Sequence, residues 1–395
     1  MLKVSTLAFW VLYPPLIAFS ITPLLPPEFS DAAMILRHGL VWLLALLALI
    51  YSNKVLQNYQ IRRAVVLAVA ATSIAALLWI TRLTLSTGLN FNDLYSSFGF
   101  TAILLAAATA SYSLAHYGHM KVLLWAICIS LVIFSFLHIA EGLVIFTDEY
   151  GRSRMLLGFV HPGKLSQLLA LPAVIALVSS VNRHEFRFTS RNFWAFVFAF
   201  LLVALTNTRT TLIILFFVLL GRTLDRFSYT SKITSTTFVV GLFFLLGVYA
   251  FLGLESSQTN SITSGRLLLW ATTLSINLER FGSSMFLIGA TEQPTAPYRF
   301  FLDGTLEEPS SFRVDNGFLE VLIVHGAPVL ILLTTSLLVL LRNYQKDSRA
   351  AILSMSILAL QIGESGFYEI GGWFGFFLLA LLFYSLRTFD YRPAR

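Results

Sequence analysis

The chain has 395 residues, of which 57% are hydrophobic and only 12% are charged, and its formal net charge is +7. A soluble domain carries about 25% charged residues, so water is a poor solvent for this chain. The composition therefore excludes a soluble enzyme, a disordered protein and a secreted domain held together by disulfides. The single cysteine, Cys128, lies in an apolar run and has no intrachain partner for a disulfide.

Long apolar stretches follow one another along the chain. A helix needs about 20 apolar residues to cross the hydrocarbon core of a bilayer, and about 12 stretches come near that length. They lie near 5–24, 39–56, 64–86, 98–116, 122–146, 165–182, 192–206, 209–221, 236–254, 323–341, 350–366 and 370–386. The stretches 192–206 and 209–221 are short, and they form either two spans or one long broken helix.

The basic residues indicate how these spans are oriented, because lysine and arginine stay on the cytoplasmic side. With a cytoplasmic N-terminus, alternate loops hold 17 of the 27 basic residues and four of the 20 acids. The basic residues of this side are Lys3, Lys54, Arg62, Arg63, Lys121, Arg183, Arg187, Arg191, Arg222, Arg226, Lys232, Arg342, Lys346, Arg349, Arg387, Arg392 and Arg395. The positive charge is thus explained by topology and indicates no nucleic-acid partner.

We therefore expect an all-α polytopic membrane protein, with about 12 transmembrane helices, both termini in the cytoplasm and one large periplasmic loop. Residues 1–254 hold the first nine helices, 255–314 form the loop, and 315–395 hold the last three helices of the same unit. A loop of about 60 residues is too long to be a mere connector.

Cationic side chains gather in three places on the outer side. The first place holds Arg152, Arg154 and Lys164, the second holds Arg209, and the third holds Arg266, Arg280 and Arg313. Charges at membrane depth are costly and usually functional, and the arginine fork suits a phosphate. The pattern indicates a site for a lipid phosphate. The alternative is that these arginines anchor helix ends at headgroups or pair with nearby acids.

Several carboxylates lie close to the same outer segments. Asp315 and Glu320 are about one helical turn apart, and Glu364 and Glu369 flank the outer end of a span. Any of them is a candidate base for a sugar hydroxyl, although Glu364 and Glu369 fit better as partners of the arginines. No cluster has the spacing of a metal site, and no phosphate-binding loop is present. We expect no metal and no cofactor.

Four stretches, in this order and on this topology, resemble those of the O-antigen ligase and O-antigen polymerase superfamily of integral membrane glycosyltransferases. Residues 154–165 look like the start of a middle helix of the family, with Gly163 where asparagine is usual. Residues 208–212 resemble its Ser/Thr-Arg-small helix start, and 265–270 resemble its Gly-Arg-x-x-x-Trp loop motif. Residues 315–319, followed by Gly326, are similar to its His-Asn-x-x-Leu…Gly motif, with Asp315 in place of histidine.

The resemblance implies transfer of a glycan from an undecaprenyl-diphosphate-linked oligosaccharide at the outer leaflet of the bacterial inner membrane, with the active site facing the periplasm and no metal. It implies that Arg209 and Arg266 hold the donor diphosphate, while Asp315 can accept the proton of a sugar hydroxyl. The expected substrate-binding residues are Arg154, His161, Lys164, Trp270, Arg313, Asn316 and Glu320.

Three functions remain open. A polymerase of O-antigen or capsule repeats is favoured, because an aspartate at position 315 fits polymerases better than ligases. A ligase that transfers the glycan to lipid A core is the second. A polytopic lipid or solute transporter is the third, but transporters typically have paired repeats around a site at the bilayer midplane. A chain-length regulator is a candidate partner of a polymerase.

Overall fold

The computed structural model describes the parts of the chain from which the bundle is built. These are residues 27–85, 91–117, 145–147, 153–155, 162–179, 191–206, 208, 211–212, 214–216, 270, 273–275, 277–279, 282–289, 295–297, 311–313, 316–341, 353–354, 356–357, 360 and 373–390. This part of the chain is mostly helical, as expected. The expected spans at 5–24 and 236–254, and almost all of that at 122–146, lie outside it.

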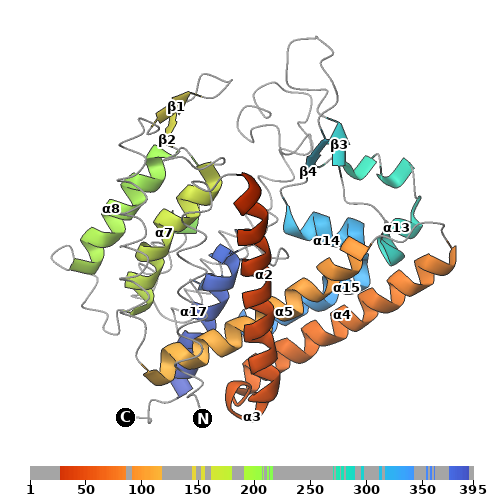
Figure 1. The fold of residues 1–395 in the computed structure, drawn as a ribbon, viewed down its shortest axis with the longest axis horizontal. Helices are drawn as coiled ribbons and strands as arrows, with labels where there is room; N and C mark the ends of the chain where they lie inside the picture. The colour runs from red at the N-terminus through yellow and green to blue at the C-terminus, as the bar shows by residue number, and fades with distance from the viewer. Residues whose placement is uncertain are drawn as a thin grey trace, which may run out of the picture.

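Figure 1 labels the helices of the described part of the chain. They are α2 (Pro27–Ile50), α3 (Ser52–Val55), α4 (Tyr59–Leu85), α5 (Phe91–Tyr117), α7 (Pro162–Ser179), α8 (Arg191–Leu205), α13 (Ser284–Ile288), α14 (Gly317–His325), α15 (Ala327–Leu341) and α17 (Trp373–Asp390). The helices α4, α5, α7, α8 and α17 lie where the apolar stretches predict them. Shorter helical pieces lie within the expected spans 209–221 and 350–366.

Two expected spans are not single helices. The stretch 39–56 is divided between α2 and α3, because Tyr51 leaves the helical region with φ −106° and ψ 30°. The stretch 323–341 is broken at Gly326, which has φ +81°. Pro328 follows, and a proline ring clashes with the carbonyl four residues earlier in a continuous helix. The helix α15 therefore starts anew at Ala327.

Two short hairpins interrupt the all-α expectation. In the first, β1 (Ile145–Thr147) pairs antiparallel with β2 (Ser153–Met155). In the second, β3 (Thr295–Pro297) pairs antiparallel with β4 (Ser311–Arg313). Both hairpins lie at the upper edge of the view in Figure 1, whereas α3 lies at the lower edge. The segments expected outside the membrane thus share one end of the bundle.

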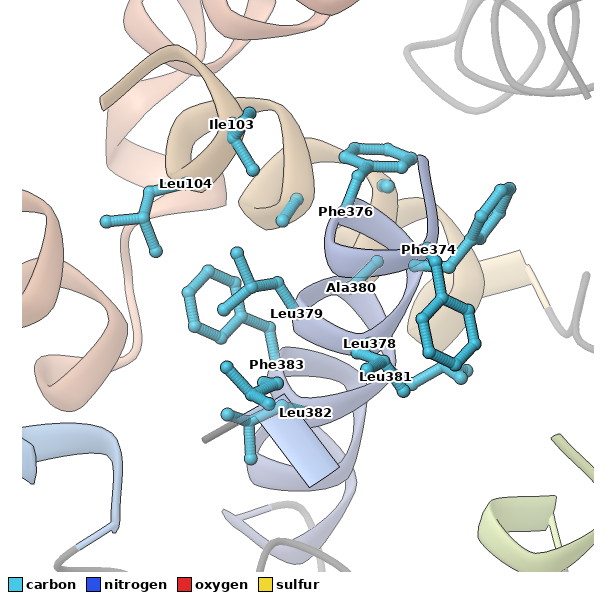
Figure 2. Packing of buried hydrophobic residues seen from close by; sticks show 14 of the residues in the cluster. Ile103, Leu104, Phe374, Phe376, Leu378, Leu379, Ala380, Leu381, Leu382 and Phe383 are labelled. Atoms are coloured by element: carbon cyan, nitrogen blue, oxygen red, sulfur yellow. The ribbon is translucent and has the colours of Figure 1, made fainter. Parts of the chain in front are cut away.

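The centre of the bundle is formed by α5 and α17. Every residue of α17 from Phe374 to Phe383 is buried, and α5 is buried over Ala102–Ser111. Figure 2 shows Phe376 and Leu379 of α17 beside Ile103 of α5. The small side chains of α5, mostly alanine, serine and threonine, allow neighbouring helices to approach closely, as at helix interfaces in membranes.

By length and composition, two of the described helices could cross a membrane: residues 59–81 of α4 and 98–115 of α5. They differ in their surroundings, since 83% of the α5 window is buried inside the protein but only 33% of the α4 window. The core helix of a soluble protein is mostly buried, and α5 fits that description as well as a membrane span. The helix α4 does not fit the description of a soluble core helix, because Val66, Leu77 and Ile80 on its apolar outer face remain exposed.

Hydrogen bonds from threonine and serine hydroxyl groups connect neighbouring helices. Thr72 of α4 and Thr101 of α5 lie 2.6 Å apart at their hydroxyl oxygens, and Thr109 donates to the Leu44 carbonyl of α2 at 2.9 Å. Ser336 of α15 donates to the Ala64 carbonyl of α4 at 2.9 Å. Such bonds are a recurrent way of joining helices where the surroundings are apolar.

Candidate functional site

The three residues expected to perform the chemistry, Arg209, Arg266 and Asp315, lie outside the described residues, as does His161. Described residues nearby locate two of these segments: Thr208 and Thr211 lie on either side of Arg209, and Asn316 follows Asp315. For Arg266 the nearest described residue is Trp270.

The two hairpins carry two of the expected cationic residues. Arg154 is the middle residue of β2 and pairs in register with Phe146 of β1. Arg313 is the last residue of β4 and pairs with Thr295 at the open end of its hairpin. Both hairpins lie on the same side of the bundle in Figure 1, so the backbone brings two of the three cationic places to one end of the molecule.

A buried hydrogen bond links the first and second cationic places. The hydroxyl oxygens of Ser166 and Thr211 lie 2.7 Å apart, and both side chains are fully buried. Ser166 lies in the first turns of α7, two residues after Lys164, and Thr211 lies two residues after Arg209. Segments 45 residues apart in sequence are thereby fixed next to each other at their outer ends.

Threonine hydroxyls also shape the turn before Arg209. The Thr206 hydroxyl donates to the Val203 carbonyl at 2.6 Å, and the hydroxyl oxygens of Thr206 and Thr208 lie 3.0 Å apart. The Val203 carbonyl, near the end of α8, also accepts from the Thr206 backbone amide at 3.1 Å. The backbone amide of Leu212 donates to the Thr208 carbonyl at 3.2 Å, which starts the next helical segment. The chain thus leaves one apolar helical segment at Thr206 and begins the next at Thr208.

Asn316 has a defined structural role at the start of α14. Its side-chain Oδ1 accepts from the Leu319 backbone amide at 2.9 Å, and its carbonyl accepts from the Glu320 amide at 2.9 Å. Asparagine is among the preferred N-cap residues because it satisfies an amide that has no partner within the helix. The expectation that Asn316 binds substrate is not tested by this bond, but Oδ1 is already engaged.

Glu320 is a buried carboxylate in the first turns of α14. It is only 8% exposed, although its helix is otherwise apolar. The positive end of the helix macrodipole favours a carboxylate there. Its position, one turn after the segment that carries Asp315, keeps it as a second candidate base. His325, at the other end of α14, is also 8% exposed.

Trp270 begins the described part of the long loop. Its indole Nε1 is buried and has no hydrogen-bond partner among the described residues. A buried indole N–H usually finds an acceptor, and this one has none among the described residues. One turn later Leu274 packs against Ile323 of α14, which ties the Trp270 segment to the helix that holds Glu320.

Thr211 belongs to a stretch that the sequence singles out, whereas its partner Ser166 does not. Ser166 is an ordinary hydroxyl residue in apolar surroundings, and its pairing with Thr211 depends on segments 45 residues apart in the chain. The only local signals for this contact were the position of Ser166 near the start of an apolar stretch and that of Thr211 near Arg209. Within the described residues, no group of three or more histidine, cysteine, aspartate or glutamate side chains is arranged to hold a metal ion.

The described geometry thus joins the segments of two cationic places through the Ser166–Thr211 bond, and it packs part of the long loop against α14, the helix that carries the buried Glu320. Neither protein-family models nor curated protein sequences give a match to this chain.

Proposed function

We propose that the chain is a polytopic membrane protein. The outer face of α4 supports this proposal, because only 33% of an apolar stretch long enough to span a bilayer is buried within the protein. The exposed face of α2 adds Ile35, Leu46 and Ile50, each at least half exposed. Apolar area of this kind is stable against lipid and costly against water. About 12 spans remain our proposal for the whole chain.

The contacts between helix ends support the proposed orientation. Arg387, at the end of α17, donates to the carbonyl of Val55 in α3. Ser336 and Ala64 join the lower parts of α15 and α4. The basic residues assign each of these ends to the cytoplasm. Ser166 and Thr211 join two ends that they assign to the periplasm.

We further propose that the protein is a polymerase of polysaccharide repeat units, such as those of O-antigen or capsule, in the bacterial inner membrane with its site facing the periplasm. The observation that carries the proposal is the Ser166–Thr211 bond, which joins the segment of Arg209 to that of Lys164 at one end of the bundle. Two cationic segments held together at an outer helix end suit a lipid diphosphate.

The proposed reaction moves a glycan between two lipid carriers. The acceptor sugar hydroxyl attacks the anomeric carbon of the donor glycan, and the bond between that carbon and the diphosphate oxygen breaks. The hydroxyl proton passes to the carboxylate of Asp315, and undecaprenyl diphosphate leaves with the bonding electrons. Arg209 and Arg266 stabilise the charge that grows on the leaving group, which lowers the barrier. This assignment needs no metal.

Deletion of the gene tests the proposal, with the cell-surface glycans separated on a gel. A polymerase predicts lipid A core that carries a single repeat. Bare core with accumulated lipid-linked polymer would instead identify a ligase, and an unchanged glycan pattern would contradict both. Complementation with the Arg209→Ala gene then tests the site, since restored long chains would remove the diphosphate role from Arg209.

A further inference from the structure

The break between α14 and α15 is in direct backbone contact with the long outer loop. A Cβ atom added to Gly326 would lie 2.6 Å from the carbonyl oxygen of Leu287 and 3.0 Å from the amide nitrogen of Gly289. Ordinary contact begins near 3.4 Å, so any side chain at position 326 must push the loop or the break away by about 0.8 Å. Gly326 also has φ +81°, a conformation that glycine adopts most easily.

The same part of the loop covers one face of α14. We call the described residues of 270–289 the outer cap. Its Leu274, Leu278 and Phe286 pack against Ile323, which is completely buried. The small cluster is separate from the main core of the bundle, so the outer cap is attached to α14 by its own contacts.

Residues of the candidate site lie on both sides of this contact. Trp270 is the first residue of the outer cap, whereas Asn316 and Glu320 lie at the start of α14. The outer cap therefore carries one group, and α14, which ends at the break, carries the other. The close approach of the outer cap to the break is possible because Gly326 has no side chain.

We propose that Gly326 is a positioning residue for glycan transfer, because it seats the outer cap on α14 and so sets the spacing between the two halves of the site. This inference rests on the proposed function. It adds that the outer cap is a fixed part of the site and that its seat can be loosened without unfolding the bundle. A displacement of about 1 Å at an active site can reduce turnover about 10²-fold.

The first experiment measures whether the outer cap is seated. Thr273 of the outer cap is completely buried, whereas Ser275 is exposed. Each is replaced by cysteine in a full-length chain that also carries Cys128→Ala, and intact cells are treated with a maleimide that does not cross membranes. We expect Thr273→Cys to be protected and Ser275→Cys to react. Adding Gly326→Ala is expected to make Thr273→Cys react at a rate close to that of Ser275→Cys.

Two other glycines serve as matched controls. Gly282 has φ +64° but nothing within 4 Å of an added Cβ, and Gly39 on α2 likewise has open space. If backbone contact is the cause, Gly282→Ala and Gly39→Ala leave Thr273→Cys protected. Equal labelling of Thr273→Cys in the Gly282→Ala background would assign the effect to backbone strain in general. It would contradict the inference that the contact at Gly326 holds the outer cap on α14. Rapid labelling of Thr273→Cys in the unsubstituted background would overturn it as well.

The second experiment measures transfer in membranes, with lipid-linked repeats extracted from cells that lack the gene. For Gly326→Ala we expect kcat to fall about 10²-fold while KM changes less than about threefold, since the spacing of the reacting groups changes more than the binding of the lipid. Exposure of the outer cap with an unchanged kcat would refute the positioning role but leave the proposed function intact. A wild-type chain that makes no polymer would refute the proposed function. The labelling result would still show whether Gly326 holds the outer cap on α14.

Discussion

Replacement of Arg387 by alanine is expected to destabilise the lower end of the bundle. Arg387 is 4% exposed, and its guanidinium joins three segments. Its Nε donates to the Ser111 hydroxyl at 3.0 Å, and one terminal nitrogen donates to the Val55 carbonyl and, more weakly, to that of Ala108 at 3.3 Å. The guanidinium carbon also lies 5.6 Å from the centre of the Tyr112 ring.

The magnitude follows from these contacts. A hydrogen bond from a charged group contributes about 1.5–3 kcal/mol, and a cation over an aromatic ring adds about 0.5–1 kcal/mol. Folding of the wild-type protein removes the guanidinium from water at a free-energy cost, and the alanine variant avoids this cost, which offsets part of the sum. We therefore expect Arg387→Ala to lower the free energy of unfolding by about 2–4 kcal/mol. Arg387→Lys is expected to recover only part of it, because lysine lacks the fork that reaches two helices at once.

The assay is thermal denaturation of the full-length protein in detergent, read as the loss of the monodisperse peak after heating. Arg62 provides a matched control, because it is an exposed arginine whose guanidinium carbon lies 6.0 Å from the Tyr59 ring centre. Removing it is expected to cost about 0.5 kcal/mol. If Arg387→Ala denatured at the same temperature as Arg62→Ala, the buried contacts would contribute nothing and the reasoning would be wrong.

Three further substitutions test other parts of the molecule. Arg266→Ala is expected to abolish long-chain polysaccharide while the protein persists in the membrane, and Arg266→Lys should restore only part of it; normal glycan banding in Arg266→Ala would exclude the diphosphate role. Asp315→Asn is expected to reduce transfer more than binding of the lipid-linked donor, and a fully active variant would remove its assignment as the base. Asn316→Ala is expected to cost about 1 kcal/mol of stability through loss of the N-cap, measured by the same denaturation assay, whereas Asn316→Asp retains the cap; equal losses would argue against capping.

The spans that form single helices could be located from the sequence, because a continuous apolar run is a local signal. Thus α4, α7 and α8 begin within about five residues of their expected starts, inside the usual uncertainty of helix ends or slightly beyond it. The start of α4 also has a local cause: the Asn58 side chain accepts from the backbone amides of Gln60 and Ile61 at 3.0 and 3.1 Å.

The contacts that assemble the candidate site could not be read from the sequence. The pairing of Ser166 with Thr211 spans 45 residues, and hydropathy does not distinguish one hydroxyl from another in such a run. The break at Gly326 falls inside an apolar stretch, where hydropathy predicts a single helix, although Gly326 and Pro328 are local signals for a break. The contact of the Leu287 carbonyl with this break could not be read from the sequence, because it joins backbone segments far apart in the chain.

The break at Gly326 and the contact of the outer cap explain each other physically. The 15 residues of α15 rise about 22 Å, less than the roughly 30 Å of a hydrocarbon core. In the proposed topology, with the lower end of α15 at the cytoplasmic boundary of the bilayer, Gly326 would lie about 8 Å inside the outer boundary. Backbone that leaves a helix at that depth is tolerated only where protein or a water-filled cavity covers it. The backbone of residues 287–289 provides that cover, so loosening it would expose the break to lipid as well as displace Trp270.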